Sequence, residues 1–571
     1  MTLRTGLSLL AACGWLIFAV CVDSAEAGSA EAARQYRVTE LAVEADADPA
    51  ASLDRDVVVS EWRGPDGVRV RVPAFWDGGR TWRVRFTPTR PGRWTYRIVP
   101  AGAGTNAAGG ATPDAGPPLA EGDLNVQPAG PSANPLHRHG PFLKVGPTHR
   151  YLTYTDGTPL FWLGDTWWFC PSDLVPIDSS NRPGVPSMYK ALVDKRAAQR
   201  FTVLHMAFLG GVEAPGGKGA FRDLLGGTIR PAYWQQADRY IRYANAKGLV
   251  PVIGFGLHQS LSAPTLGQLK RLWRYALARY GAMGVGFLVC GEYNQASEKD
   301  GKRAFREQDR QRVEKILALG RFIKAHDPWK RAMTVHPWWY RGDRRQAWGE
   351  PWYDFIMLQG GHGPRGPDAG FYRDIYGRAS PKPLLEGECT YEGIHGMTAG
   401  VVRRNAYKAI QAGCFGYTYG AHGLWYPTQN ERDETFKEWG EPIPWWRALA
   451  APGADHMTHL RGAYERVAWW DLVPVAADRI VWPKENGPRR EVWVKAVGDA
   501  TIVVYEAACK TPSPTPVLQL EGQGGAYGVT VIDPRTGEAT DRPGSVTSAN
   551  GRLDLPAPPD GRDWVLILRR K

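Results

Sequence analysis

The sequence is poor in cysteine and has no long apolar run beyond its first residues. Only 7 of its 571 residues are cysteine, none of them in a Cys-x-x-Cys pair, and the five that follow residue 21 lie far apart. This spacing gives no disulfide framework, so we expect buried free thiols, with a single bridge as the alternative. No later segment holds 18 or more consecutive apolar residues, and we expect no membrane span.

The first 27 residues have the pattern of a signal peptide. Arg4 precedes an apolar run over residues 7–20, and Ala25-Glu26-Ala27 offers a cleavage site of small residues. We therefore expect cleavage after Ala27 and export to the periplasm or the extracellular space.

Clusters of one charge sign are also absent. The chain has 70 Lys and Arg against 58 Asp and Glu, a net charge of +12, but the basic residues are scattered, so no nucleic-acid partner is expected. Tryptophan and tyrosine are abundant instead, at 24 and 23 residues. Their flat rings with a polar handle suit sugar binding, although core packing is their more common use.

Three patterns follow one another along the chain. Residues 33–130 contain short alternating strands with turn signals, which is typical of a β-sandwich. Residues 140–455 alternate eight near-continuous apolar strands with helical segments, and residues 465–571 return to short strands. The sequence therefore predicts an α/β protein with a central (β/α)8 TIM barrel between N-terminal and C-terminal β-sandwich domains.

Polar and aromatic residues gather where the predicted barrel strands end. The carboxyl ends of TIM-barrel strands build the active site, so we expect substrate-binding side chains there. They are Asp165, Trp167, His258, Asn294, His336, Trp338, Gln359, His362, Tyr391, His422 and Trp425, with Trp339 as a further member of a stacking wall. Core burial is the alternative for the histidines and tryptophans, and a structural hydrogen bond for Asp165.

Two glutamates end apolar strands of the predicted barrel. Glycoside hydrolysis needs two carboxyl groups that flank the scissile bond. By analogy with retaining barrel glycosidases, Glu292 after the fourth strand is the expected acid/base and Glu388 after the seventh the expected nucleophile. Alternation along the strand does not separate Glu388 from Glu386, but Glu388 lies nearer the strand end. Glu392 is interpreted as a rim residue, and loop closure is the alternative role for Glu292.

Several segments resemble the apiosidase-like glycoside hydrolases, family 140 and its relatives. In the predicted barrel they are "DGTPLFWLGDTWW", "HP" at 336–337, "QGGH" at 359–362 and "KPLLEGECTYEG". The flanks, "FWDGGRTWRVRFTPTRPGRWTYRI" and "MTHLRGAYERVAWWDLVPV" with "VTVIDPRTGEA" and "DWVLIL", resemble the N-terminal sandwich and the C-terminal collagen-binding-like domain of such proteins.

The resemblance implies a retaining barrel glycosidase that acts on a complex, often plant cell-wall, glycan. It implies the acid/base and nucleophile roles for Glu292 and Glu388. The chain departs from the family pattern at Cys290-Gly291-Glu292, where Gly-Gly-Asp is common, and this departure puts terminal apiose in question as its substrate.

Two other functions fit the sequence less well. A non-catalytic carbohydrate-binding or cell-surface protein on a glycosidase scaffold is disfavoured because both carboxylates are present. A barrel metallohydrolase needs His-x-His on its first strand, where this chain has Gly-Asp-Thr-Trp, so no metal and no cofactor are expected. The sequence thus predicts a secreted retaining glycoside hydrolase acting on a polysaccharide or oligosaccharide, while the linkage, endo or exo attack and the oligomeric state have no signature in it.

Overall fold

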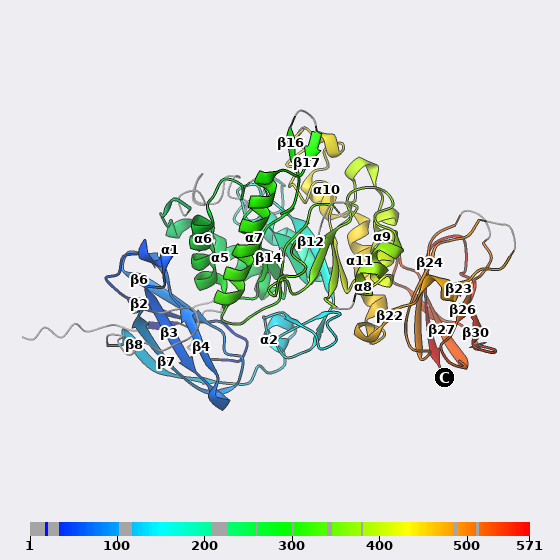
Figure 1. Cartoon of the computed structure of the whole chain (residues 1–571), viewed down its shortest axis with the longest axis horizontal. Coiled ribbons are helices and arrows are strands. Elements are labelled where there is room, and N and C mark those ends of the chain that lie inside the picture. The colour runs from blue at the N-terminus through cyan, green and yellow to red at the C-terminus, as the bar shows by residue number, and fades with distance from the viewer. Residues whose placement is uncertain are drawn as a thin grey trace, which may run out of the picture.

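The computed structural model describes residues 18–20, 33–101, 117–206, 225–258, 260–299, 302–339, 345–378, 381–484, 488–509 and 513–571. They form an N-terminal sandwich, a central barrel and a C-terminal β domain in a row (Figure 1). The predicted fold class is confirmed. The predicted signal peptide lies outside the described residues except for the backbone of Phe18–Val20, and the predicted domain limits stay a prediction.

Two antiparallel sheets form the N-terminal sandwich. In β3, buried Ser60 and Trp62 alternate with exposed Glu61 and Arg63, because successive side chains of a strand point to opposite faces. Trp62 stacks on Phe86 in this core, with ring centroids 3.9 Å apart. The sheets are β1 (Phe18–Val20), β2 (Thr39–Glu44), β6 (Thr81–Phe86), β5 (Phe75–Gly78), and β4 (Arg69–Pro73), β3 (Val58–Arg63), β7 (Gly92–Pro100), β8 (Ala120–Val126). The short helices α1 (Ala51–Asp54) and η1 (Pro65–Gly67) lie between strands.

The central sheet has eight strands, and every hydrogen-bonded pair in it is parallel. Its order is β18-β15-β14-β13-β12-β21-β20-β19, so it is a nearly closed barrel in which the strands follow one another around the ring. The strands are β12 (Trp162–Trp167), β13 (Val203–Met206), β14 (Val250–Ile253), β15 (Gly286–Leu288), β18 (Met333–Thr334), β19 (Ile356–Gln359), β20 (Leu384–Glu388) and β21 (Gly416–Tyr419).

Helices cover the outside of the barrel with one apolar face each. In α6, a capping box between Thr265 and Gln268 begins the helix, and Leu269, Leu272 and Trp273 are buried against the sheet. The α-helices from the entry into the barrel to its end are α2 (Pro135–His139), α3 (Met188–Ala198), α5 (Pro231–Ala246), α6 (Leu266–Tyr280), α7 (Glu307–His326), α8 (Ala369–Tyr376), α9 (Ala399–Gln411), α10 (Trp445–Leu449) and α11 (Pro452–Tyr464).

Smaller elements complete the central part. The antiparallel hairpin of β16 (Ser297–Lys299) and β17 (Lys302–Ala304) projects from the barrel at the top of Figure 1. The other elements are β9 (Lys144–Val145), β10 (Leu152–Thr153), β11 (Pro159–Leu160), η2 (Ile394–Gly396), η3 (Lys437–Trp439) and η4 (Trp469–Asp471). None of the described helices is both long and apolar enough to cross a membrane.

The C-terminal domain pairs a large antiparallel sheet with a small one. Tyr505 stacks on Tyr407 of α9 with ring centroids 4.4 Å apart, and Arg403 of α9 donates to Asp563, so this domain packs on the barrel. The large sheet contains β22 (Val473–Pro474), β24 (Val492–Val497), β25 (Thr501–Glu506), β31 (Trp564–Arg570), β27 (Ala526–Ile532), β28 (Ala539–Asp541) and β29 (Val546–Thr547). The small sheet contains β23 (Ile480–Val481), β26 (Val517–Gln519) and β30 (Arg552–Asp554), and η5 (Ala477–Arg479) precedes β23.

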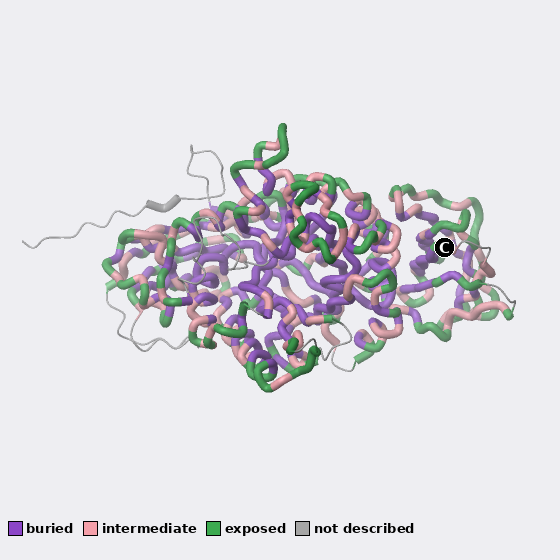
Figure 2. The backbone as a smooth tube through the Cα atoms, turned by 90° about the horizontal axis from the view of Figure 1, so that it is seen from above, coloured by how far each residue is buried: buried purple, intermediate pink, exposed green. Residues whose placement is uncertain are grey.

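A buried network of charges joins the N-terminal sandwich to the barrel. Arg85 of β6 donates to Glu40 (2.7 Å) and to Asp238 of α5, and Arg279 of α6 donates twice to Asp238 at 2.8 Å. Burial would raise the pKa of Glu40, but Arg85 and Arg242 outweigh it and lower that pKa to about 2. Figure 2 shows buried residues running on from the sandwich into the barrel. The two parts therefore share an interior.

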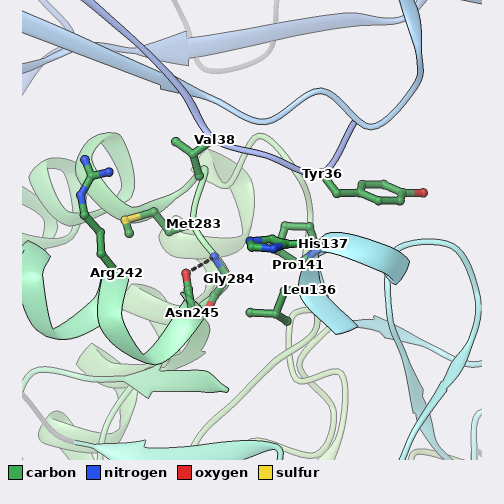
Figure 3. A pocket seen from close by; sticks show the side chains of 9 residues that line it. All are labelled: Tyr36, Val38, Leu136, His137, Pro141, Arg242, Asn245, Met283 and Gly284. Carbon is green, nitrogen blue, oxygen red and sulfur yellow. Dashed lines mark hydrogen bonds between the residues drawn. The ribbon is translucent and has the colours of Figure 1, made fainter. Parts of the chain in front are cut away.

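A small cavity lies at the same junction. Figure 3 shows Tyr36 and Val38 of the N-terminal part opposite Asn245 and Gly284 of the barrel, with the Gly284 amide donating to Asn245 at 3.0 Å. Its volume is about 30 Å³, room for about one water molecule. It is too small for a substrate.

The charge network makes a stability prediction. Asp238→Asn keeps the shape of the side chain but leaves the two buried guanidinium groups of Arg85 and Arg279 without their shared counter-charge. We expect a loss of about 3–5 kcal/mol in the free energy of unfolding, measured by urea titration. Asp46→Asn is the control, because its ion pair with Arg80 is exposed and is worth about 1 kcal/mol or less. Equal losses in the two variants would contradict a structural role for the network.

Candidate active site

The barrel carries a pocket of about 680 Å³ at the carboxyl ends of its strands. Two carboxylates lie in it, Glu292 and Glu388, between walls that are largely aromatic. The aromatic lining residues are Trp168, Trp338, Trp339, Tyr391, Trp425, Phe436 and Trp439. Such rings can stack on the faces of sugar rings.

The end of β20 separates Glu388 from Glu386. The register between β19 and β20 shifts, so that Leu358 pairs with Glu386 and Gln359 with Glu388. Glu386 is fully buried and accepts from the Tyr372 hydroxyl of α8 at 2.5 Å and from the backbone amides of Gly360 and Glu388. It thus faces the helix layer, and burial raises its pKa to about 7. Of Glu386 and Glu388, only Glu388 lines the pocket.

Glu292 follows β15 in an uncommon backbone conformation. Its φ is +48°, a left-handed value that costs a non-glycine residue roughly 1–3 kcal/mol. The surrounding turn holds it there: Tyr293 N donates to the His336 carbonyl and Gln295 N to the Glu292 carbonyl, both at 3.0 Å. In this conformation the Glu292 carboxylate lines the pocket.

Gln359, the last residue of β19, bridges the two carboxylates. Its Nε2 donates to Glu292 Oε1 at 2.9 Å and to Glu388 Oε1 at 2.8 Å. These two oxygens are therefore no further apart than the sum of the two bonds, 5.7 Å.

The environment drives the two carboxyl groups toward opposite protonation states. Burial and the nearby Glu388 raise the pKa of Glu292. Burial alone would also raise the pKa of Glu388. Contacts with His336 (Nε2 to Oε2, 3.2 Å) and His362 (Nε2 to Oε1, 3.1 Å) instead hold this pKa well below its usual range. One carboxyl acid beside one carboxylate is the pair that acid-assisted nucleophilic chemistry needs.

The structure brings most of the predicted residues to this place. Besides the two glutamates, the pocket is lined by Trp338, Gln359, His362, Tyr391 and Trp425. Tyr391 Oη lies among the side chains of Glu388, Thr166 and Trp168, and within the described residues Trp425 Nε1 is buried without a hydrogen-bond partner. Since an unpaired buried polar group is costly, Trp425 Nε1 is available for a sugar hydroxyl.

Three predicted residues lie one layer behind the lining. His336 is fully buried and touches Glu388, while His258 Nδ1 lies 3.9 Å from Glu292 Oε2. Asn294 Oδ1 accepts from Trp338 N at 2.8 Å and so fixes the turn that carries this tryptophan. These side chains contact or lie beside pocket residues rather than line this pocket, and His258 lines a second cavity next to it.

The remaining predicted residues lie away from the pocket lining. Asp165, predicted to bind sugar hydroxyls, is fully buried and accepts from Arg196 Nε of α3 (2.6 Å) and from Trp167 Nε1 (2.9 Å). An internal ion pair thus uses the carboxylate, and Trp167 is its buried partner. His422 is buried behind the loop after β21, where burial lowers its pKa.

Some lining residues carried no usable signal in the sequence. Arg303 belongs to the hairpin of β16 and β17, and His395, Phe436 and Trp439 come from loops after β20 and β21. Trp168 did carry a signal in the sequence, because it directly follows the end of β12. Among the described residues, no group of three or more His, Cys, Asp or Glu side chains is arranged to hold a metal ion.

Comparison with known proteins identifies the barrel. Residues 147–471, more than half of the chain, match the family described as apiosidase-like, catalytic domain. The chain belongs to the apiosidase-like family. This apiosidase-like protein is a glycoside hydrolase with a carbohydrate substrate. Its residues 32–100 match a domain of unknown function, DUF5060, and no curated protein matches the chain.

Solved structures share the fold of the apiosidase-like protein. A protein of Bacteroides vulgatus classed provisionally as a glycoside hydrolase is 15% identical, with a TM-score of 0.67 over 95% of this chain and 100% of its own. A family 5 glycoside hydrolase of the same organism is 20% identical, with a TM-score of 0.59 over 75% of this chain and 94% of its own.

Proposed function

We propose that the protein is an exported enzyme that hydrolyses O-glycosidic bonds of a complex polysaccharide by retaining double displacement. Glu388 is the nucleophile and Glu292 the acid/base. The bridge through Gln359 carries this proposal, because an upper limit of 5.7 Å between two carboxylate oxygens suits a retaining enzyme. Retaining enzymes hold their carboxyl groups about 5–5.5 Å apart, whereas inverting ones need about 6.5–9.5 Å for the intervening water.

The reaction divides into two displacements. In the first, Glu388 attacks the anomeric carbon while Glu292 gives its proton to the leaving oxygen, so the glycosidic bond breaks and a glycosyl ester forms on Glu388. In the second, the ionised Glu292 takes a proton from water, and the water oxygen displaces Glu388 from the anomeric carbon. The low pKa of Glu388 and the raised pKa of Glu292 support these roles.

An adjoining cavity supports a polymeric substrate. It has a volume of about 460 Å³ and shares Gln295 and Arg303 with the main pocket. Both shared residues follow Glu292 in the chain, and the leaving group lies on the side of the acid. Ser262, Ser297 and Gln308 line this cavity, which gives it a polar wall for further sugars of the leaving chain.

A product analysis tests the function and the mechanism together. Purified protein is incubated with plant and microbial polysaccharides, and released sugars are separated by chromatography. Proton NMR of the first product formed is expected to show the same anomer as the substrate bond. An inverted first product would exclude double displacement. Binding to a polysaccharide with no product from any of them would favour a non-catalytic carbohydrate-binding protein.

A further inference from the structure

The amide of Gln359 has every hydrogen-bonding group engaged. Its Nε2 carries two hydrogens and has two acceptors, Glu292 Oε1 and Glu388 Oε1. Its Oε1 accepts from Trp339 N at 2.5 Å. Gln359 therefore has no free N–H for a sugar hydroxyl, and the second lone pair of its Oε1 is the acceptor left for one.

The orientation of this amide is fixed by its partners. A backbone N–H only donates, and an ionised carboxylate only accepts. Turning the amide over would set its oxygen against the ionised Glu388 and its NH2 group against the Trp339 N–H. Two contacts would fail at once, so the network assigns Nε2 to the glutamates.

The fold places Gln359 between the two glutamates. The register shift after Leu358 sets Gln359 opposite Glu388 on β20. On its other side it holds Trp339, which has a left-handed φ of +33°. Two strained residues, Glu292 and Trp339, thus hydrogen-bond to the same amide, which stabilises both conformations.

We propose that Gln359 is a positioning residue that determines which oxygen of Glu292 carries the catalytic proton. Because Nε2 only donates, Glu292 Oε1 accepts from it. The carbonyl oxygen of a neutral carboxyl group is a better acceptor than its hydroxyl oxygen, so the proton of the acid lies on Oε2. This proton passes from Oε2 to the leaving oxygen, and Oε2 later receives the proton of the attacking water. The inference rests on the proposed acid/base role of Glu292, and it adds the atom and the residue that selects it.

Neutron crystallography of the deuterium-exchanged wild-type protein tests the proton position without any substrate. Crystals kept at a pH where Glu292 is neutral are expected to show deuterium on Oε2 and two Gln359 deuterons directed at Glu292 Oε1 and Glu388 Oε1. Deuterium on Glu292 Oε1 would overturn the proposal. This result does not depend on activity, so it stays separate from a failure of the proposed function.

The pH profile of Gln359→Met tests the positioning role. Loss of the donor removes a contact that lowers the pKa of Glu292, so the basic limb of kcat/KM is expected to move to higher pH. Glu388 also loses a donor, so the acid limb is expected to move the same way. Misplaced carboxyl groups are expected to reduce kcat/KM by about 10²-fold.

A matched variant separates positioning from general damage. Gln411 of α9 is also buried and donates to the Val503 carbonyl, outside the pocket. Gln411→Met is expected to keep the wild-type pH profile. A profile of Gln359→Met with both limbs unmoved would contradict the proposal, even if its activity were lower.

Discussion

Glu388→Gln is expected to lower kcat/KM by on the order of 10⁴- to 10⁶-fold and to leave the fold intact, as losses of nucleophiles in other enzymes do. The amide has nearly the shape of the carboxylate but cannot form the glycosyl ester. Its oxygen still accepts one hydrogen bond, so the contacts with Gln359, His336 and His362 change in charge rather than in packing. Kinetics and circular dichroism of the purified variant measure the two quantities.

Glu386→Gln is the matched control. Glu386 lies two residues away and is also buried, but it faces Tyr372 and not the pocket. Its amide is expected to keep the fold and most of the activity, with some loss of stability. A collapse of activity in Glu386→Gln together with full activity in Glu388→Gln would transfer the nucleophile role to Glu386.

Glu292→Gln is expected to lower kcat/KM by about 10²- to 10⁴-fold, the usual contribution of general acid–base catalysis. The size of the loss should depend on the leaving group. In a natural substrate the leaving group is a sugar hydroxyl, which needs the proton from Glu292, so the rate of its release falls by the full factor. A phenolate with a low pKa leaves without that proton, so formation of the glycosyl ester from an aryl glycoside is expected to suffer far less.

Azide provides the second readout for the Glu292 variant. Azide is a nucleophile that needs no general base, so it attacks the glycosyl ester that water now hydrolyses slowly. Added azide is expected to restore turnover of aryl glycosides and to release a glycosyl azide with the substrate's anomeric configuration. Equal losses for all leaving groups, without rescue, would assign Glu292 a structural role.

Local patterns in the sequence predicted the barrel and the place of its site. Eight apolar runs separated by amphipathic helices admit few other folds, and the ends of parallel strands must meet at one rim. Glu292, Gln359, His362 and Glu388 end or follow three such strands. Strand periodicity and topology alone therefore bring these four side chains to the same rim.

The remaining features depend on contacts that periodicity does not encode. Asp165 ends a strand like the others, but Arg196, far along the chain on α3, packs beneath it and takes its carboxylate. The register shift beside Gly387 decides between Glu386 and Glu388, and simple alternation misses it. Phe436 and Trp439 reach the pocket from a loop, where no periodic pattern marks the position of a side chain.

The buried ion pairs between the N-terminal sandwich and the barrel limit which N-terminal domains can precede this barrel. The family match begins at residue 147, but Asp238 and Arg279 of the barrel depend on Arg85, which precedes that match. Without this sandwich, Asp238 of α5 would keep Arg279 as a partner but lose Arg85, and Arg279 of α6 would lose Asp77. A different leading domain would therefore have to offer matching charges to the residues of these two helices that face it.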